Sequence, residues 1–176
     1  MSLESEQGCN VTFVLGGARS GKSKFAEDLV LKMGLKPIYL ATGRALDEEM
    51  GERIAIHQER RGAEWETVEE PLALVDALQS SAYSGRVILV DCLSLWVTNL
   101  MMAKADVAKE SAALAALLGE IKVPVVLVSN EVGMGIIPDN AMARRYMDLA
   151  GDVNQRVAHA ASEVYFVVSG MPLKMK

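Results

Sequence analysis

The stretch Gly16-Gly17-Ala18-Arg19-Ser20-Gly21-Lys22-Ser23 decides how the rest of this chain is interpreted. It matches the pattern G-x-x-x-x-G-K-[ST] in full, and it lies between an apolar run at 11–15 and a helical pattern at 22–33. A strand, a glycine-rich loop and a helix in this order form a phosphate-binding loop, in which backbone N–H groups at the helix N-terminus surround a polyphosphate. The sequence therefore predicts a nucleoside-triphosphate site.

Each residue type in this loop suits that chemistry. Gly16 and Gly21 allow the backbone to turn tightly and to approach a phosphate closely. Lys22 supplies positive charge to the outer phosphates, and the hydroxyl of Ser23 is placed to bind Mg²⁺. We expect further phosphate contacts from Arg19. The nucleotide-binding residues predicted from the loop are Gly16, Gly17, Ala18, Arg19, Ser20, Gly21, Lys22 and Ser23.

Five short apolar runs predict a buried parallel sheet. They are rich in β-branched residues and nearly continuous, which is typical of strands covered on both faces. Helical patterns alternate with them, so the order favours an α/β domain with right-handed crossovers. The tail at 172–176 is a candidate for a short, antiparallel edge strand. The apolar runs are 11–15, 37–40, 87–90, 125–128 and 164–168, and the helical patterns are 22–33, 46–61, 71–79, 105–120 and 141–161.

Length and composition indicate one domain. The chain has 176 residues, of which 51% are hydrophobic and 23% charged, and these values exclude a disordered chain. We predict a disordered leader at 1–8 and a single P-loop nucleotide-binding catalytic domain at 9–176. Cys9 and Cys92 have no metal-type spacing, so we interpret both as reduced, structural thiols.

The net charge and the hydropathy pattern limit which partners and which cellular location we expect. The net charge of −5 is not typical of a nucleic-acid-binding protein. No apolar run approaches the roughly 18 residues that span a membrane, so we expect no membrane insertion. The acidic, polar N-terminus lacks the features of a secretory signal, which favours a cytoplasmic location.

A carboxylate follows the third apolar run. Asp91 comes directly after the run at 87–90, in the manner of a Walker B segment, whose carboxylate supports the metal in P-loop enzymes. Asp91 also precedes a helical-looking segment, so a helix-capping or turn role is the alternative. Because a phosphate loop is present, we favour Mg²⁺ binding by Ser23 and Asp91. The polar stretch 129–131 ends another strand and should emerge at the same edge of the sheet.

His57 continues the apolar stripe of the helical pattern at 46–61. Leu46, Met50, Ile54 and His57 follow one another at helical spacings, so they share one helix face. A histidine on such a face is most often a core residue. Beside a nucleotide, a neutral imidazole can instead attack phosphorus and form a covalent phosphoramidate. The residues alone leave both interpretations open.

Further blocks occur in the same order as in a known family. They are Tyr39-Leu40-Ala41-Thr42, Asp47-Glu48-Glu49-Met50 with Arg53-Ile54 and His57, Trp96-Val97-Thr98-Asn99-Leu100, Asn130-Glu131-Val132-Gly133-Met134-Gly135-Ile136-Ile137-Pro138, Ala150-Gly151, Asn154-Gln155 and Val168-Ser169-Gly170. Over residues 11–176, the sequence resembles the bifunctional adenosylcobinamide kinase / adenosylcobinamide-phosphate guanylyltransferases of cobalamin synthesis.

The resemblance implies a P-loop NTPase fold with a RecA-like, mostly parallel sheet, a homotrimer and two reactions. In the first, ATP or GTP gives its γ-phosphoryl group to a hydroxyl of adenosylcobinamide, with Lys22 as a catalytic residue. In the second, the family's motif histidine, which His57 matches, attacks the α-phosphorus of GTP and releases pyrophosphate. The GMP then passes to adenosylcobinamide phosphate and gives adenosylcobinamide-GDP.

The resemblance also implies nucleotide-binding positions outside the loop. Arg60 and Arg61 are physically reasonable partners for a triphosphate. A solvated basic helix end explains the two arginines as well. The implied positions are Ala41, Thr42, Gly43, Gln58, Glu59, Arg60, Arg61, Glu69 and Asp91.

Two other functions are open alternatives. One is a single-function P-loop small-molecule kinase in which His57 is a core residue. The other is a non-catalytic, nucleotide-dependent switch protein. Covalent labelling of the protein by GTP would distinguish the bifunctional enzyme from both.

Overall fold

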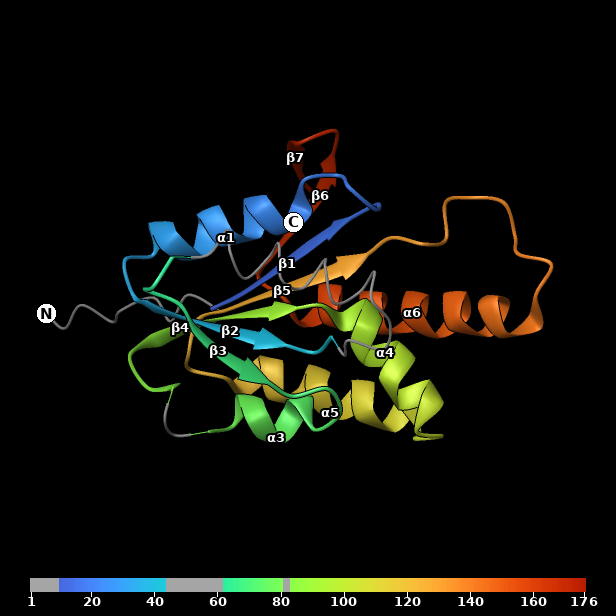
Figure 1. Ribbon diagram of the computed structural model, residues 1–176, viewed down its shortest axis with the longest axis horizontal. Helices are drawn as coiled ribbons and strands as arrows, with labels where there is room; N and C mark the ends of the chain where they lie inside the picture. Colours follow the sequence, from blue (N-terminus) through green and yellow to red (C-terminus); the bar gives the residue numbers. More distant parts are fainter. Residues whose placement is uncertain (1–9, 44–61, 81–82) are drawn as a thin grey trace, which may run out of the picture.

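The computed structural model of the chain describes residues 10–43, 62–80 and 83–176. Within these residues the strands form one seven-stranded sheet in the order β3-β2-β4-β5-β1-β6-β7 (Figure 1). All neighbouring strands run parallel except β6 and β7, which are antiparallel. The structure thus confirms the predicted α/β fold, including the antiparallel edge strand near the C-terminus.

The five apolar runs are central strands of this sheet. Each predicted strand agrees with an observed one to within two residues at either end, because these runs are buried on both faces. The strands are β1 (Val11–Gly16), β2 (Lys36–Ala41), β3 (Glu66–Glu69), β4 (Arg86–Asp91), β5 (Val125–Asn130), β6 (Glu163–Val168) and β7 (Met171–Lys174).

Helices cover both faces of the sheet (Figure 1). Helix α1 packs on one face, and the other helices that the structure describes cover the opposite face. No helix among the described residues has the length and apolar character needed to cross a membrane. The helices are α1 (Lys22–Lys32), α3 (Leu74–Leu78), α4 (Leu93–Met102), α5 (Val107–Glu120) and α6 (Ala141–Ala160).

Alternate residues of each central strand face different cores. In β2, Ile38 and Leu40 belong to the core beneath α3 to α6, whereas Tyr39 belongs to the core beneath α1. In β1, Phe13 and Val14 divide in the same way. Burial of apolar surface on both faces contributes most of the stability of such a layered domain, at about 25 cal/mol per Å².

The observed elements differ from the prediction in two places. The sequence did not predict β3, because its residues are mostly exposed and two of the four are glutamates. Helix α3 is shorter than the pattern at 71–79 indicated. The carboxylate of Glu70 accepts hydrogen bonds from the backbone N–H groups of Leu72 and Ala73, at 2.9 and 2.8 Å, and forms a turn before the helix. The predicted helix at 46–61 lies outside the described residues.

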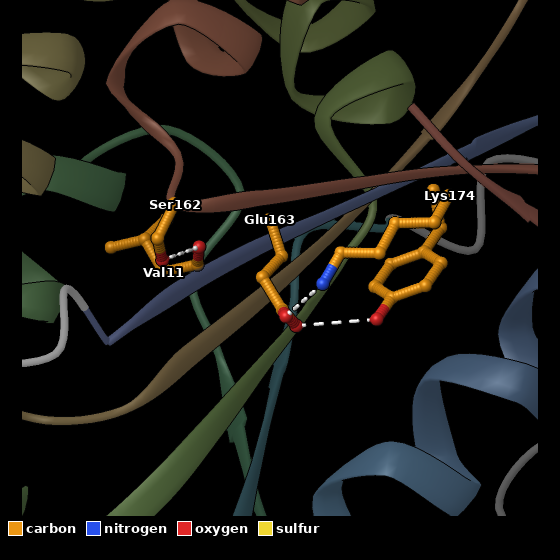
Figure 2. Close-up of polar contacts among 5 residues, drawn as sticks. Val11, Ser162, Glu163 and Lys174 are labelled. Atoms are coloured by element: carbon orange, nitrogen blue, oxygen red, sulfur yellow. Dashed lines mark hydrogen bonds and ion pairs between the residues drawn. The ribbon is translucent and has the colours of Figure 1, made fainter. Parts of the chain in front are cut away.

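An ion pair joins the two strands of the C-terminal hairpin, β6 and β7, at its open end (Figure 2). The Lys174 ammonium forms a 2.6 Å ion pair with Glu163, and this hydrogen bond holds the pKa of the Glu163 carboxyl below its ordinary value. Just before β6, the Ser162 hydroxyl donates a 2.7 Å hydrogen bond to the carbonyl of Val11 at the start of β1. The hairpin is therefore fixed to the strand that leads into the phosphate loop.

Candidate nucleotide site

The carboxyl ends of the parallel strands bring predicted site residues together from distant parts of the sequence. Ala41 at the end of β2 is in register with Glu69 of β3 on one side and with Asp91 of β4 on the other. Gly16 at the end of β1 is in register with Asn130 of β5. Ligands of open α/β sheets bind at this edge. The topology therefore brings together site residues that the sequence predicts separately.

The phosphate loop occupies the connection from β1 to α1. Gly21 is the residue that caps α1, in a left-handed conformation with φ of 93°, and it makes no side-chain cap hydrogen bond to the first turn of the helix. A Cβ atom on Gly17 would meet nothing within 4 Å, so the loop backbone is open on that side. Exposed backbone donors at a helix N-terminus provide the positive end of the helix dipole, which favours an anion such as phosphate.

Lys22 lies over this loop. Its ammonium donates a 3.1 Å hydrogen bond to the carbonyl of Gly17. Burial lowers the pKa of Lys22, and interactions with Cys92 and Asp91 oppose that shift. Lys22, at the start of α1, and Asp91, at the end of β4, therefore stand at the same edge of the sheet, and the carboxylate favours the charged form of the lysine.

The donor set suits a phosphate and a magnesium ion. The hydroxyl of Ser20 is buried and has no hydrogen-bond partner within the part of the chain that the structure describes. Ser23 lies half-buried in the first turn of α1. Mg²⁺ is usually bound by one or two protein oxygens together with phosphates and water. In this site, side-chain oxygens of Ser23 and Asp91 would hold the Mg²⁺ ion.

The carboxylate of Asp91 is oriented by a tyrosine. The hydroxyl of Tyr39 donates a 3.0 Å hydrogen bond to Oδ2 of Asp91, and the Tyr39 ring packs edge-on against Trp65. The N-cap residue of the following helix, α4, is Cys92 and not Asp91, and it makes no side-chain cap hydrogen bond. Sequence reasoning missed Tyr39 as a site residue. Its signal was a tyrosine within an otherwise apolar buried strand, where the hydroxyl requires a partner.

A buried asparagine holds the segment that follows β2. The side-chain amide of Asn99 in α4 donates hydrogen bonds to the carbonyls of Thr42 and Pro71, at 2.7 and 3.0 Å. The hydroxyl of Thr42 donates to the carbonyl of Cys92 and accepts from its N–H, at 2.7 and 3.0 Å. Thus the predicted nucleotide-binding stretch 41–43 is locked beside Asp91. Asn99 belongs to one of the blocks that resemble the family, but the sequence alone indicates no role for it.

The polar stretch at the end of β5 serves the scaffold. The backbone N–H of Asn130 donates a 2.7 Å hydrogen bond to the hydroxyl of Ser94, and its carbonyl accepts from Asn154 at 3.2 Å. The Glu131 carboxylate accepts a 2.6 Å hydrogen bond from Gly133 in the following loop.

Five predicted site residues cannot be placed. They lie outside the described residues and are His57, Gln58, Glu59, Arg60 and Arg61. Glu69 is exposed at the end of β3.

A parallel sheet with a phosphate loop after β1 and an acidic residue at the end of β4 defines a P-loop NTPase fold of the RecA-like kind. Flagellar accessory protein FlaH from Methanocaldococcus jannaschii is 13% identical over 96% of this chain and 79% of that chain, with a TM-score of 0.54. The P4 protein from bacteriophage phi6, in complex with ADP, is 16% identical over 93% of this chain and 54% of that chain, with a TM-score of 0.51. At these identities the similarity shows the fold alone.

Sequence comparison then specifies the family. The CobU family model, cobinamide kinase / cobinamide phosphate guanyltransferase, matches residues 12–175, and the chain belongs to this family. The bifunctional adenosylcobalamin biosynthesis protein CobP of Pseudomonas aeruginosa is 48% identical over 93% of this chain and 95% of its own length. The corresponding CobU proteins of Escherichia coli and Salmonella typhimurium are 39% and 41% identical, each over 93% of this chain and 98% of their own length. The family resemblance predicted from the sequence is confirmed.

Proposed function

We propose that this transferase phosphorylates adenosylcobinamide with ATP or GTP and then transfers GMP from GTP to adenosylcobinamide phosphate. The observation that carries the proposal is the phosphate loop of a family member with Asp91 held beside it. The parallel register of β1, β5 and β4 brings the loop and Asp91 to the same edge of the sheet, and the family match covers both. The family match favours this activity over a single-function kinase and over a non-catalytic switch.

In the kinase step, the acceptor hydroxyl forms a bond to the γ-phosphorus while the bond to the nucleoside diphosphate breaks and the hydroxyl loses its proton. Lys22 and the loop N–H groups offset the negative charge that develops on the phosphoryl oxygens. Mg²⁺, bound through Ser23 and Asp91 together with the phosphates, would supply further charge neutralisation. The stretch Ala41, Thr42 and Gly43, together with Glu69, is proposed to contact the nucleotide farther along the same sheet edge.

In the transfer step, an imidazole nitrogen of His57 would attack the α-phosphorus as the bond to pyrophosphate breaks. A phosphate oxygen of the acceptor would then take the GMP and free the imidazole. Such covalent catalysis splits one difficult displacement into two easier steps. This role rests on the sequence match, as do the proposed triphosphate contacts of the neighbouring stretch 58–61.

Labelling with α-³²P-GTP tests the transfer step. We expect an acid-labile GMP label on the wild-type protein and on His159→Ala, whose histidine is exposed on α6, and no label on His57→Ala. The His57→Ala protein should keep part of its kinase activity. A label that persists on His57→Ala would exclude the assigned role. Cobinamide phosphorylation without any label on the wild type would support a single-function kinase, and absence of any turnover would support a switch protein.

The assembly and location that we propose are a homotrimer in the cytoplasm. The loop after β5 supports the first part, because three of its apolar side chains are strongly exposed. Met134, Ile136 and Ile137 are 79, 98 and 69% exposed. Contiguous exposed apolar side chains are typical of protein–protein contacts.

A further inference from the structure

The tip of the C-terminal hairpin lies against the phosphate loop. Residues Val168 and Met171 form the last pair between β6 and β7, so Ser169 and Gly170 make a two-residue turn. Both turn residues have positive φ, 51° and 79°. This is the geometry of the tight hairpin turn that matches the twist of two antiparallel strands, and it sets the direction of the Gly170 N–H group.

The contact between turn and loop is a short backbone hydrogen bond. The N–H of Gly170 donates to the carbonyl of Ser20 at 2.7 Å. The two backbones are also close, since a Cβ atom on Gly21 would lie 3.1 Å from the Cα of Gly170. On the other side of the loop, a Cβ on Gly16 would lie 2.7 Å from the carbonyl of Val167 in β6. Two glycines of the phosphate-loop motif are therefore confined by the hairpin.

The hydrogen bond has a direct consequence for the loop. The carbonyl of Ser20 and the N–H of Gly21 belong to the same planar trans peptide, so they point in opposite directions. Because Gly170 draws the Ser20 carbonyl toward the hairpin, the Gly21 N–H must point away from it. That N–H stands at the N-terminus of α1, among the donors with which a phosphate loop binds its anion.

The hairpin is anchored firmly enough to hold this peptide. The ring of Tyr165 in β6 packs edge-on against Phe25 of α1, with centroids 5.1 Å apart. At the open end of the hairpin, Lys174 pairs with Glu163 (Figure 2). Strand β6 also pairs with β1 up to Gly16 and Val167, so the hairpin is fixed to β1 and to α1, the two elements that the phosphate loop connects.

We propose that Gly170 is a positioning residue of the nucleotide site, which orients the Ser20–Gly21 peptide so that the Gly21 N–H faces a bound phosphate. The inference rests on the proposed nucleotide binding at this loop. It extends the site to the Ser169–Gly170 turn, which lies almost 150 residues from the loop in sequence. Losing a charge-assisted hydrogen bond to phosphate weakens binding about 10- to 100-fold.

The test compares glycine substitutions that introduce similar backbone strain at different places. Gly170→Val and the milder Gly170→Ala disturb the turn, because a residue with a Cβ atom disfavours positive φ. Gly34→Val is the matched control, since Gly34 has φ of 68°, no atom within 4 Å of its Cβ position, and a place between α1 and β2 at the opposite edge of the sheet. Gly170→Asn is the conservative variant, because asparagine tolerates this conformation and keeps the N–H.

Two quantities are measured for each protein, the Kd for GTP by calorimetry and the urea midpoint of unfolding. We expect Gly170→Val and Gly170→Ala to bind GTP about 10- to 100-fold more weakly, with Gly170→Asn close to wild type. Gly34→Val should lose comparable stability and bind GTP normally. Normal GTP binding by Gly170→Val, as by Gly34→Val, would overturn the positioning role while leaving the proposed function intact. If Lys22→Ala bound GTP as tightly as the wild-type protein, both the positioning role of Gly170 and the proposed function would be overturned.

Discussion

The hydroxyl of Tyr39 and the carboxylate of Asp91 are joined by a 3.0 Å hydrogen bond between neighbouring strands β2 and β4. The two strands place Ala41 in register with Asp91, so the tyrosine lies two residues earlier on β2 and reaches forward to the carboxylate. One oxygen of Asp91 is thereby occupied by a protein donor. The bond restricts the orientation in which the carboxylate meets a bound cation.

Tyr39→Phe should weaken the response to Mg²⁺ more than it weakens the fold. The ring remains packed on Trp65, so we expect a stability loss of about 1 kcal/mol, but an unoriented Asp91 should raise the Mg²⁺ concentration for half-maximal kinase activity about 10- to 100-fold. A magnesium titration of the kinase reaction measures this. Tyr165→Phe, which alters a tyrosine on β6, serves as the control and should titrate normally. An unchanged Mg²⁺ requirement in Tyr39→Phe would contradict the orienting role.

Asn99→Ala should destabilise the protein strongly. The substitution leaves the carbonyls of Thr42 and Pro71 without their side-chain donor, and each unsatisfied buried group costs about 1–3 kcal/mol. We expect a total loss of about 2–4 kcal/mol in urea unfolding. Asn10→Ala removes an exposed asparagine that donates to the carbonyl of Lys122, and it should cost less than about 1 kcal/mol. Similar losses of unfolding free energy for the two variants would show that the hydrogen bonds of Asn99 contribute no more than those of an exposed asparagine.

Cys92 should be inert toward thiol reagents in the folded protein. Burial, reinforced by Asp91, raises the pKa of its thiol to about 11, so about one molecule in a thousand carries the thiolate at pH 8. In a Cys9→Ser background, which leaves Cys92 as the reporter, alkylation by iodoacetamide should be slow in buffer and fast in urea. Mass spectrometry of the alkylated chain gives both rates, and rapid native labelling at Cys92 would contradict the buried assignment.

The ion pair between Lys174 and Glu163 should stabilise the hairpin in a pH-dependent way. The folded-state pKa of Glu163 lies below its ordinary value, so the stabilising contribution is present above that ordinary value and is lost as the pH falls through the lowered pKa. Lys174→Met should raise the pKa of the Glu163 carboxyl in an NMR titration. Its stability deficit relative to wild type should disappear in acid. A deficit that is the same at acidic and neutral pH would argue against this linkage.

Ile136→Asp should disturb the proposed assembly. Ile136 is 98% exposed in the loop after β5, so a charged residue there does not affect the core, but it would be costly inside a subunit contact. We expect the wild-type protein to have the mass of a trimer in size-exclusion chromatography with light scattering, and the variant to shift toward the monomer. Ala103→Asp, on the exposed turn after α4, adds the same single negative charge and provides the control. A trimer that tolerates Ile136→Asp would place the contact elsewhere.

Much of the architecture could be predicted because the strong signals are local. The apolar runs identified β1, β2, β4, β5 and β6, and the tail was recognised as an edge strand. Strand β3 could not be predicted from an apolar run, because an exposed edge strand need not be apolar. Helix α3 was predicted too long because the side chain of Glu70 competes for the backbone donors that would begin it. Both errors arise where a side chain or an edge position overrides the periodic pattern.

The sequence by itself determined the phosphate loop, the five central strands and the family, because each is encoded in consecutive residues or in the order of short blocks. The tertiary structure decided which side chains serve that loop. Three pairs become partners only when segments from distant parts of the chain meet at one edge of the sheet. They are Tyr39 and Asp91, Asn99 and Thr42, and Gly170 and Ser20. The physical reason is that a hydrogen bond depends on distance and direction in space, whereas a motif records only spacing along the chain.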